Sequence, residues 1–232
     1  MRCLRMFALV FTLGLLAACT PAATDTKRVA VDQFAGEVSY YPQETGATWS
    51  YLSEGSSLES TPLIQRVEGP TVLNNDIWIG TSIAGVGLEG VRYRQYRPDG
   101  VFLLMETAPG VETTHNPPIQ EFPAPDSLRV GQTWGGDTTT TVFFPSADED
   151  EQTQVFEVNY VYTVVDKRMV NLQSGSFEVF VINMIGRNFD DMGNEAETIS
   201  QEIWFAPYIG HVRTREGLFL VDTNVVGQVA AE

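Results

Sequence analysis

One cysteine of this chain stands where it can be acylated. Residues 1–18 begin with two positive charges, Arg2 and Arg5, followed by an apolar run over residues 6–16. That run has the length of the apolar region of a secretory signal and is too short for a stable spanning helix. The sequence Leu-Ala-Ala before Cys19 matches the lipobox, in which small residues fit the signal peptidase and the cysteine thiol takes a diacylglycerol. The pattern predicts a lipoprotein signal over 1–18 and lipidation of Cys19.

Lipidation at Cys19 predicts an envelope protein anchored to a membrane by its N-terminus. Two or three acyl chains anchor stably, whereas a single short chain binds only marginally. Thr20 follows Cys19, whereas an aspartate at that position indicates retention at the inner membrane. In a host with two membranes, we therefore expect the protein at the outer membrane, on its periplasmic or surface face. The alternatives are an ordinary secretory signal with a chance cysteine, or a buried helix. Residues 19–36 are mostly small and polar, which is typical of a flexible tether.

Composition excludes several classes of function. The second cysteine, Cys3, lies inside the signal, so a processed chain has no thiol nucleophile, no cysteine metal site and no disulfide. The formal net charge of the whole chain is −16. A surface this acidic repels nucleic acid and anionic headgroups, so no nucleic-acid partner is expected.

Arg92, Arg94 and Arg97 form a local positive cluster in this acidic chain. The alternation of the surrounding residues indicates a strand, on which Arg92 and Arg94 share one face. Salt bridges to acidic side chains of neighbouring strands are one interpretation. The other is a site for an anionic headgroup or a peptide carboxylate, which makes Arg92 and Arg94 candidate ligand-binding residues.

The remaining motifs do not support catalysis. His115 and His211 are the only histidines and are not clustered as in a catalytic zinc site. The segment 85–90 matches Gly-x-Gly-x-x-Gly, but a strand-like sequence follows it where a dinucleotide site needs a helix, so we expect a flexible connection or a β-bulge. Ser174 lacks the Gly-x-Ser-x-Gly frame of a hydrolase. We predict no catalytic residue, no metal ligand and no cofactor, although a hydrolase using only carboxylates stays open.

Two acidic stretches, 148–151 and 190–197, are expected to be solvated loops. Oxygen ligands for Ca²⁺ are present in Asp190–Glu197, but the spacing does not match an EF-hand. Calcium binding there is left open.

From Val38 onward, runs rich in β-branched and aromatic residues are separated by Gly, Pro, Asn and Asp, and no long helical stripe is present. This pattern predicts an antiparallel all-β domain over 37–232. Turn chemistry at 97–100, 108–110 and 215–217 separates expected strands. The strand from Phe177 has apolar residues on both faces, which is typical of a central strand.

A weak internal repeat is also present. Gly46-Ala-Thr-Trp49 recurs as Gly131-Gln-Thr-Trp134, and residues 94–104 resemble 211–220. Two related β halves, 37–110 and 125–226, explain this, and so does chance similarity among amphipathic strands. The proline-rich segment 117–125 between the halves favours polyproline II structure and predicts a crossover connection.

Three phrases resemble an uncharacterised class of bacterial envelope lipoproteins. They are Tyr40-Tyr-Pro42 with Gly46-x-x-Trp49-x-Tyr51, Ser174-Gly-Ser-Phe-Glu178, and Trp204-Phe-Ala-Pro-Tyr-Ile-Gly-His-Val212. Leu172-Gln-Ser-Gly175 departs from the usual Val-Pro-Ala-Gly and affects a turn. The resemblance spans roughly residues 40–220 and implies a strongly curved antiparallel sheet, similar to the open half-barrels of periplasmic lipoprotein carriers. It implies no catalytic residues.

Together these observations predict a single curved antiparallel sheet or open half-barrel, with two related β halves as an option. Trp49, Trp134 and Trp204 are either core residues or the wall of a ligand cavity. We expect a non-enzymatic, membrane-anchored envelope lipoprotein that binds or carries a lipid or other apolar ligand. The alternative is a structural lipoprotein that docks onto an envelope protein assembly. A cavity of roughly 300–1,000 Å³ lined by aromatic side chains favours the first, and a filled core with an exposed apolar patch favours the second.

Overall fold

The structure is a computed structural model that describes residues 37–149, 151–189 and 194–225. The signal, Cys19 and the tether lie outside these residues, so lipidation and the domain boundaries stay predictions. Within them the chain is β-structure, apart from turns, loops and one 3-10 turn, η1 (Pro125–Ser127). The predicted antiparallel all-β class is confirmed.

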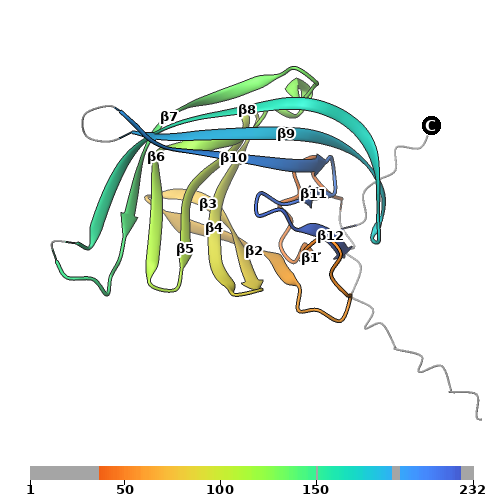
Figure 1. The fold of residues 1–232 in the computed structure, drawn as a ribbon, viewed down its shortest axis with the longest axis horizontal. Helices are drawn as coiled ribbons and strands as arrows, with labels where there is room; N and C mark the ends of the chain where they lie inside the picture. Colours follow the sequence, from red (N-terminus) through yellow and green to blue (C-terminus); the bar gives the residue numbers. More distant parts are fainter. Residues whose placement is uncertain (1–36, 150, 190–193, 226–232) are drawn as a thin grey trace, which may run out of the picture. The chain divides into compact units, whose positions relative to one another are not determined.

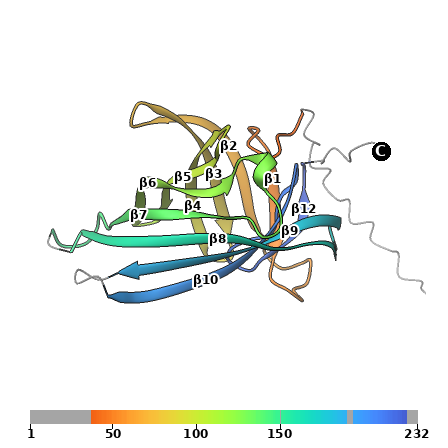
Figure 2. The ribbon, with the colours of Figure 1, turned by 90° about the horizontal axis from the view of Figure 1, so that it is seen from above.

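Over the described residues, twelve antiparallel strands close into a barrel (Figures 1 and 2). Apart from the closing pair, each strand pairs with its neighbours in sequence. The strands are β1 (Thr48–Leu52), β2 (Leu63–Leu73), β3 (Asp76–Gly85), β4 (Leu88–Arg97), β5 (Gly100–Ala108), β6 (Val111–Pro123), β7 (Thr133–Phe143), β8 (Thr153–Leu172), β9 (Gly175–Phe189), β10 (Glu195–Ala206), β11 (Gly210–Arg213) and β12 (Phe219–Thr223).

Strand β1 closes the sheet because it pairs on both edges. Trp49 lies opposite Gln65 of β2 and opposite Thr223 of β12. The expected open half-barrel is therefore wrong in this detail, since no free edge remains between the first and last strands. The closing pair joins segments from the two ends of the domain, which local patterning does not reveal.

The strands differ greatly in length. Strands β8 and β9 have 20 and 15 residues, whereas β1, β11 and β12 have five, four and five. The β8–β9 hairpin consequently extends beyond the short strands and arches past β11 and β12 (Figure 1). The apolar face of this extension packs near β12, which creates an outer layer on one side of the barrel.

The predicted turns are confirmed. Residues 98–99 join β4 to β5, 109–110 join β5 to β6, and 214–218 join β11 to β12. The glycine-rich motif is a two-residue hairpin turn, in which Val86 and Gly87 have φ values of 54° and 76°. A strand follows it, as expected, but the turn is tighter than the flexible connection or bulge that was predicted.

The proline-rich segment is not a crossover connection. Residues 117–123 belong to β6, and Ile119 and Phe122 pair with β5. The ladder between β6 and β7 ends at Asn116, directly before Pro117. Pro117 and Pro118 are tolerated because neither edge has a ladder position there: the β7 ladder has ended, and the β5 register passes from Thr114 directly to Ile119.

Side chains bridge β6 where its ladder to β7 ends. Tyr160 of β8 accepts a hydrogen bond from the Gln120 N–H at 2.9 Å, and Trp134 Nε1 donates to the Gln120 carbonyl at 3.1 Å. Thr138 Oγ1 donates to the Pro117 carbonyl at 2.7 Å. We call this region the β6–β7 seam. These bonds satisfy backbone groups that a ladder normally satisfies.

The two Gly-x-Thr-Trp phrases adopt the same local structure. Gly46 and Gly131 have φ values of 89° and 83° in turns that lead into β1 and β7. Their N–H groups donate to Val67 and Val164 carbonyls, both at 2.8 Å. Whether the two halves derive from a duplication stays a prediction.

The core consists of two clusters that meet at β9. Val179 and Val181 belong to one cluster, and Phe180 and Ile182 belong to the other. Both faces of β9 are buried, which confirms the predicted central strand.

The acidic run at 148–151 lies between β7 and β8 as expected, but Glu195–Glu197 begin β10 rather than forming a loop. Residues 190–193 lie outside the described chain.

Candidate functional site

Arg92 and Arg94 of β4 point into the barrel, where carboxylates of the next two strands meet them. Arg92 Nε donates to Glu106 Oε1 at 2.6 Å. Arg94 binds Glu121 with two nitrogens, Nε at 2.5 Å and Nη2 at 3.2 Å. The side chains of Arg94 and Glu121 are only 9% and 11% exposed, so this bidentate pair is buried.

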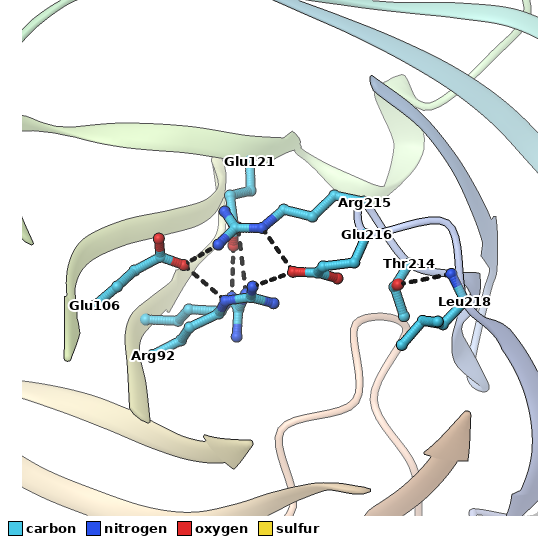
Figure 3. Close-up of polar contacts among 8 residues, drawn as sticks. Arg92, Glu106, Glu121, Thr214, Arg215, Glu216 and Leu218 are labelled. Atoms are coloured by element: carbon cyan, nitrogen blue, oxygen red, sulfur yellow. Dashed lines mark hydrogen bonds and ion pairs between the residues drawn. The ribbon is translucent and has the colours of Figure 1, made fainter. Parts of the chain in front are cut away.

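The turn between β11 and β12 reaches the same cluster from the other side of the barrel (Figure 3). Arg215 Nη2 lies 2.5 Å from Glu106 Oε1, and Arg215 Nε lies 3.1 Å from Glu216 Oε1. Glu216 Oε1 also lies 2.5 Å from Arg92 Nη2. Arg92, Glu106, Arg215 and Glu216 thus form a closed circuit of ion pairs, which we call the ion ring.

A hydrogen-bonded turn presents Arg215 and Glu216 to the ring. The Thr214 N–H donates to the Leu218 carbonyl at 2.9 Å, and Thr214 Oγ1 accepts from the Leu218 N–H at 3.3 Å (Figure 3). Gly217 has a φ of 81°, which lets the chain reverse. Local turn chemistry therefore directs two charged side chains into the barrel.

The charges in this cluster balance. Burial alone raises the pKa of Glu106, but the Arg215 and Arg92 guanidinium groups outweigh it and bring the pKa to about 2. The pKa values of Glu121 and Glu216 are lowered in the same way, against burial, by their arginine partners. All three carboxylates are ionised at neutral pH. Of the two interpretations of Arg92 and Arg94, the salt bridges are present, and both guanidinium groups are already engaged.

The barrel interior is otherwise filled. Tyr41, Phe122 and Phe205 pack with ring centroids 4.8–5.2 Å apart. The cavity beside Trp49, Arg94 and these rings has a volume of about 50 Å³, and a second, towards the ion ring, has about 20 Å³. Such volumes hold a few water molecules and no acyl chain. The volumes of these two interior cavities are far below the range of roughly 300–1,000 Å³ expected for a ligand-binding cavity.

The three predicted tryptophans do not converge on one site. Trp49 Nε1 donates to the Ile209 carbonyl at 2.6 Å and borders the small cavity. Trp134 stacks on Tyr162 with centroids 5.4 Å apart and planes at 4°. Both support the barrel wall. Trp204 is next to the inward-facing Phe205 on β10, so it points to the opposite, outer face.

Trp204 lines a groove on the outside of the barrel. The groove has a volume of about 420 Å³ and lies between the tip of the β8–β9 hairpin, the loop after β1, and β12. Trp204 and Phe219 meet edge to face in its wall, with centroids 5.4 Å apart. Its apolar wall consists of Leu52, Val170, Leu172, Trp204, Phe219, Leu220 and Val221. We call this the outer groove, and its volume falls within the usual range of small-molecule sites.

A second hollow borders the ion ring at the barrel mouth. It has a volume of about 250 Å³ and combines apolar Ile83, Leu88 and Val111 with Glu106 and Arg215. Arg92 and Arg215 are neutralised here by Glu106 and Glu216, and Glu89 is the remaining charged lining residue, so the hollow offers no free positive charge to a ligand.

The two histidines lie in separate settings, His115 buried and His211 half-buried. His115 Nδ1 is 3.0 Å from Thr140 Oγ1, and His211 contacts the rings of Phe122 and Phe205. Burial, assisted by Arg94, lowers the pKa of His211 to about 4. Over 37–149, 151–189 and 194–225, no three His, Cys, Asp or Glu side chains are grouped to hold a metal ion. Calcium binding at 190–197 is untested because residues 190–193 are outside this range.

Sequence reasoning missed Glu106, Glu121, Arg215 and Glu216 of the charged cluster, and Phe219 of the outer groove. Arg215 and Glu216 were recognised only as turn residues. Glu106 gave a weak indication in the sequence, because it is a charged residue that follows the apolar run Val101–Met105 in a strand otherwise directed at the core. No local pattern indicates which arginine such a carboxylate meets.

In the residues that the structure describes, fold and site define a closed antiparallel barrel with a charge-balanced, filled interior and an apolar groove on its outside. In the part of the chain that the structure describes, no helix has the length and apolar character needed to cross a bilayer. No protein-family model matches the chain, and no curated protein matches it in sequence.

Two solved structures are similar to this one. A Bacteroides fragilis protein described as an exported protein with a YmcC-like fold has a TM-score of 0.50 and 16% identity, covering 81% of this chain and 99% of its own. A Parabacteroides distasonis protein described as a lipoprotein has a TM-score of 0.44 and 11% identity, covering 81% of this chain and 100% of its own. At 16% identity the first likeness shows the fold alone.

Proposed function

We propose that this protein is a lipid-anchored envelope protein that binds an apolar ligand in the outer groove without catalysis. The groove carries the proposal, because its volume of about 420 Å³ and its Trp204 and Phe219 wall suit an apolar molecule. The lipobox at Cys19 supports the anchor, and the similar fold of a protein described as exported is in line with an envelope location.

The proposed site lies on the outside of the barrel, whereas a carrier of the expected half-barrel type would hold its ligand inside. The interior cavities of about 50 and 20 Å³ are too small for an acyl chain. The outer groove needs no opening of the barrel, since it lies between the overhanging β8–β9 hairpin and β12. Of the candidate residues, only Trp204 belongs to the proposed site.

Native mass spectrometry of the mature chain from residue 19, with Cys19→Ser to remove the acylation thiol, tests ligand binding. We expect a stoichiometric apolar molecule after purification without detergent, or uptake of added fatty acid or alcohol. Phe219→Ala should abolish retention, whereas Phe143→Ala, which removes an exposed aromatic side chain from β7, should not. A persistently ligand-free mass, or equal losses in both variants, contradicts the proposal.

The anchor has its own test. Cells labelled with palmitate should yield a labelled protein in the membrane fraction, and Cys19→Ala should lose both the label and the membrane association. Retention of label in that variant contradicts lipidation at Cys19.

A docking role is the second candidate. Val72 and Ile77 lie directly opposite each other near the tip of the β2–β3 hairpin and are 69% and 63% exposed. An exposed apolar pair is a possible contact for an envelope protein. A photo-crosslinker at Ile77 should capture one defined partner if docking is the function, whereas no defined partner is expected if the groove is the functional site.

A further inference from the structure

We infer that the ligand of the outer groove is a single-chain amphiphile with an anionic headgroup, and that Arg168 contacts this headgroup. The inference rests on the proposed function, because it names the ligand class of the same groove. Its support is that arginine side chains lie beside the aromatic residues of the groove wall and that one of them has no strong ion pair.

Each aromatic side chain of the wall has a guanidinium group beside it. Arg168 Cζ lies 5.0 Å from the centroid of the Trp204 ring, and Arg213 Cζ lies 5.8 Å from that of Phe219. Arg168 pairs across the sheet with the buried Val179, on the face of the β8–β9 hairpin that also carries Val170 and Leu172 of the groove wall. Neither arginine lines the groove itself, but each guanidinium lies over the ring of a wall residue, so positive charge borders the apolar wall as an anionic amphiphile requires.

Arg168 is the guanidinium available to a ligand. Its side chain is 46% exposed, and its carboxylate neighbour, Asp166, is 3.7 Å away and 49% exposed. Exposed pairs of this kind contribute little, so a ligand headgroup can replace Asp166. Arg213 is less available, because its Nη1 donates to the Glu202 carbonyl and lies 3.5 Å from the Glu202 carboxylate. Arg213 therefore contributes positive electrostatic potential near the groove and is not free to contact a headgroup.

Carboxylates also lie at the groove, and they would favour a cationic headgroup instead of an anionic one. Glu54, in the loop after β1, also lines the groove, and Glu202 accepts a hydrogen bond from Trp204 Nε1 at 2.8 Å. Glu202 is already paired with Arg213, which leaves Glu54 as the opposing carboxylate among the lining residues. The net charge of −16 opposes an anionic ligand, but salt screens exposed charges beyond a Debye length of about 8 Å, so the inference depends on the direct contact with Arg168.

The test compares lauric acid, lauryl alcohol and laurylamine, which share one chain length and differ in headgroup charge. Isothermal titration calorimetry is done below the micelle concentrations on the mature Cys19→Ser chain. We expect the acid to bind about tenfold more tightly than the alcohol, and the amine most weakly. Arg168→Gln should remove most of the advantage of the acid and leave the affinity for the alcohol unchanged.

Arg187→Gln is the matched control. Arg187 is a similarly exposed arginine with a weak ion pair, to Glu195 at 3.8 Å, near the other end of β9. It should bind the acid as the parent protein does. Because both arginines are exposed, circular dichroism should show that both variants fold.

Each outcome decides a separate point. Equal affinities for acid and alcohol, or an unchanged preference in Arg168→Gln, overturn the headgroup inference and leave the apolar groove standing. Tighter binding of the amine overturns it in favour of Glu54. Failure of all three amphiphiles to bind contradicts the proposed function itself.

Discussion

Arg92 on β4 and Glu216 in the β11–β12 turn form an ion pair inside the barrel, with Nη2 and Oε1 2.5 Å apart, although the two residues are 124 positions apart in sequence. Arg215, the neighbour of Glu216, contacts Glu106 on β5. Two consecutive side chains thus attach the last hairpin to the far wall. Strands β11 and β12 share a single paired position, Arg213 opposite Phe219, and these ion pairs add contacts to those that β11 and β12 make with β10 and β1.

Removing a carboxylate from the ion ring should destabilise the fold. In Glu216→Gln, Arg92 and Arg215 keep their charges in a largely buried site but lose the negative charge that they share. We expect the free energy of unfolding in urea to fall by about 2–4 kcal/mol. The control is Glu178→Gln, which breaks an exposed pair with Lys167 and should cost less than about 1 kcal/mol. Equal losses in the two variants would mean that the ring has no special role.

Stability should fall with acid in two stages. The pKa of His211 is about 4 in the folded protein against 6.5 in an ordinary histidine, so the unfolded chain binds the proton more readily. Stability therefore decreases as pH falls from 6.5 towards 4. The lowered pKa of His115 adds to this stage, with burial as its main cause. Glu106, with a pKa of about 2 against 4.5, contributes stability that is present above 4.5 and lost as pH falls towards 2.

Urea unfolding at successive pH values measures both stages. His211→Gln should flatten the dependence between pH 6.5 and 4 and leave the lower stage unchanged. A stability that is constant from pH 6.5 to 4.5 in the parent protein contradicts the lowered pKa of His211.

The β6–β7 seam should depend on the Tyr160 hydroxyl. Tyr160→Phe removes the acceptor of the Gln120 N–H, and the unsatisfied donor should cost about 1–2 kcal/mol. Hydrogen exchange of the Gln120 amide should accelerate at the same time. Tyr93→Phe is the control, since the Tyr93 hydroxyl has no hydrogen-bond partner within the described residues. An unchanged exchange rate at Gln120 would show that the seam is held by other contacts.

The β3–β4 turn offers a matched pair of glycines. Gly85 and Gly87 both have positive φ, 118° and 76°, but only at Gly85 would an added Cβ meet backbone, 2.1 Å from the Pro62 carbonyl oxygen. Gly85→Ala should lower the free energy of unfolding by more than about 2 kcal/mol, and Gly87→Ala by about 1 kcal/mol. Thermal unfolding of both variants measures the difference. A larger loss at Gly87 contradicts the close approach of β2 to Gly85.

Local chemistry predicted much of the fold. The turns at 98–99 and 109–110 follow from Pro and Gly in short spacers, and the burial of β9 follows from apolar residues at consecutive positions. The segment 117–123 was misassigned because prolines exclude ladder bonds on one edge only, and the sequence does not show which edge is paired. The shared face of Arg92 and Arg94 was predictable, whereas their partners Glu216 and Glu121 were not.

The sequence by itself determined the antiparallel all-β class, the positions of the hairpin turns and the expectation of a lipid on Cys19, because alternation, turn residues and the lipobox are local features. Only the tertiary structure decided that β1 closes the barrel, that the interior is filled, and that Trp204 faces an outer groove while Trp49 faces inward. The physical reason is that strand register and the overhang of β8 and β9 determine which side chains meet. Both depend on contacts between segments far apart in the chain.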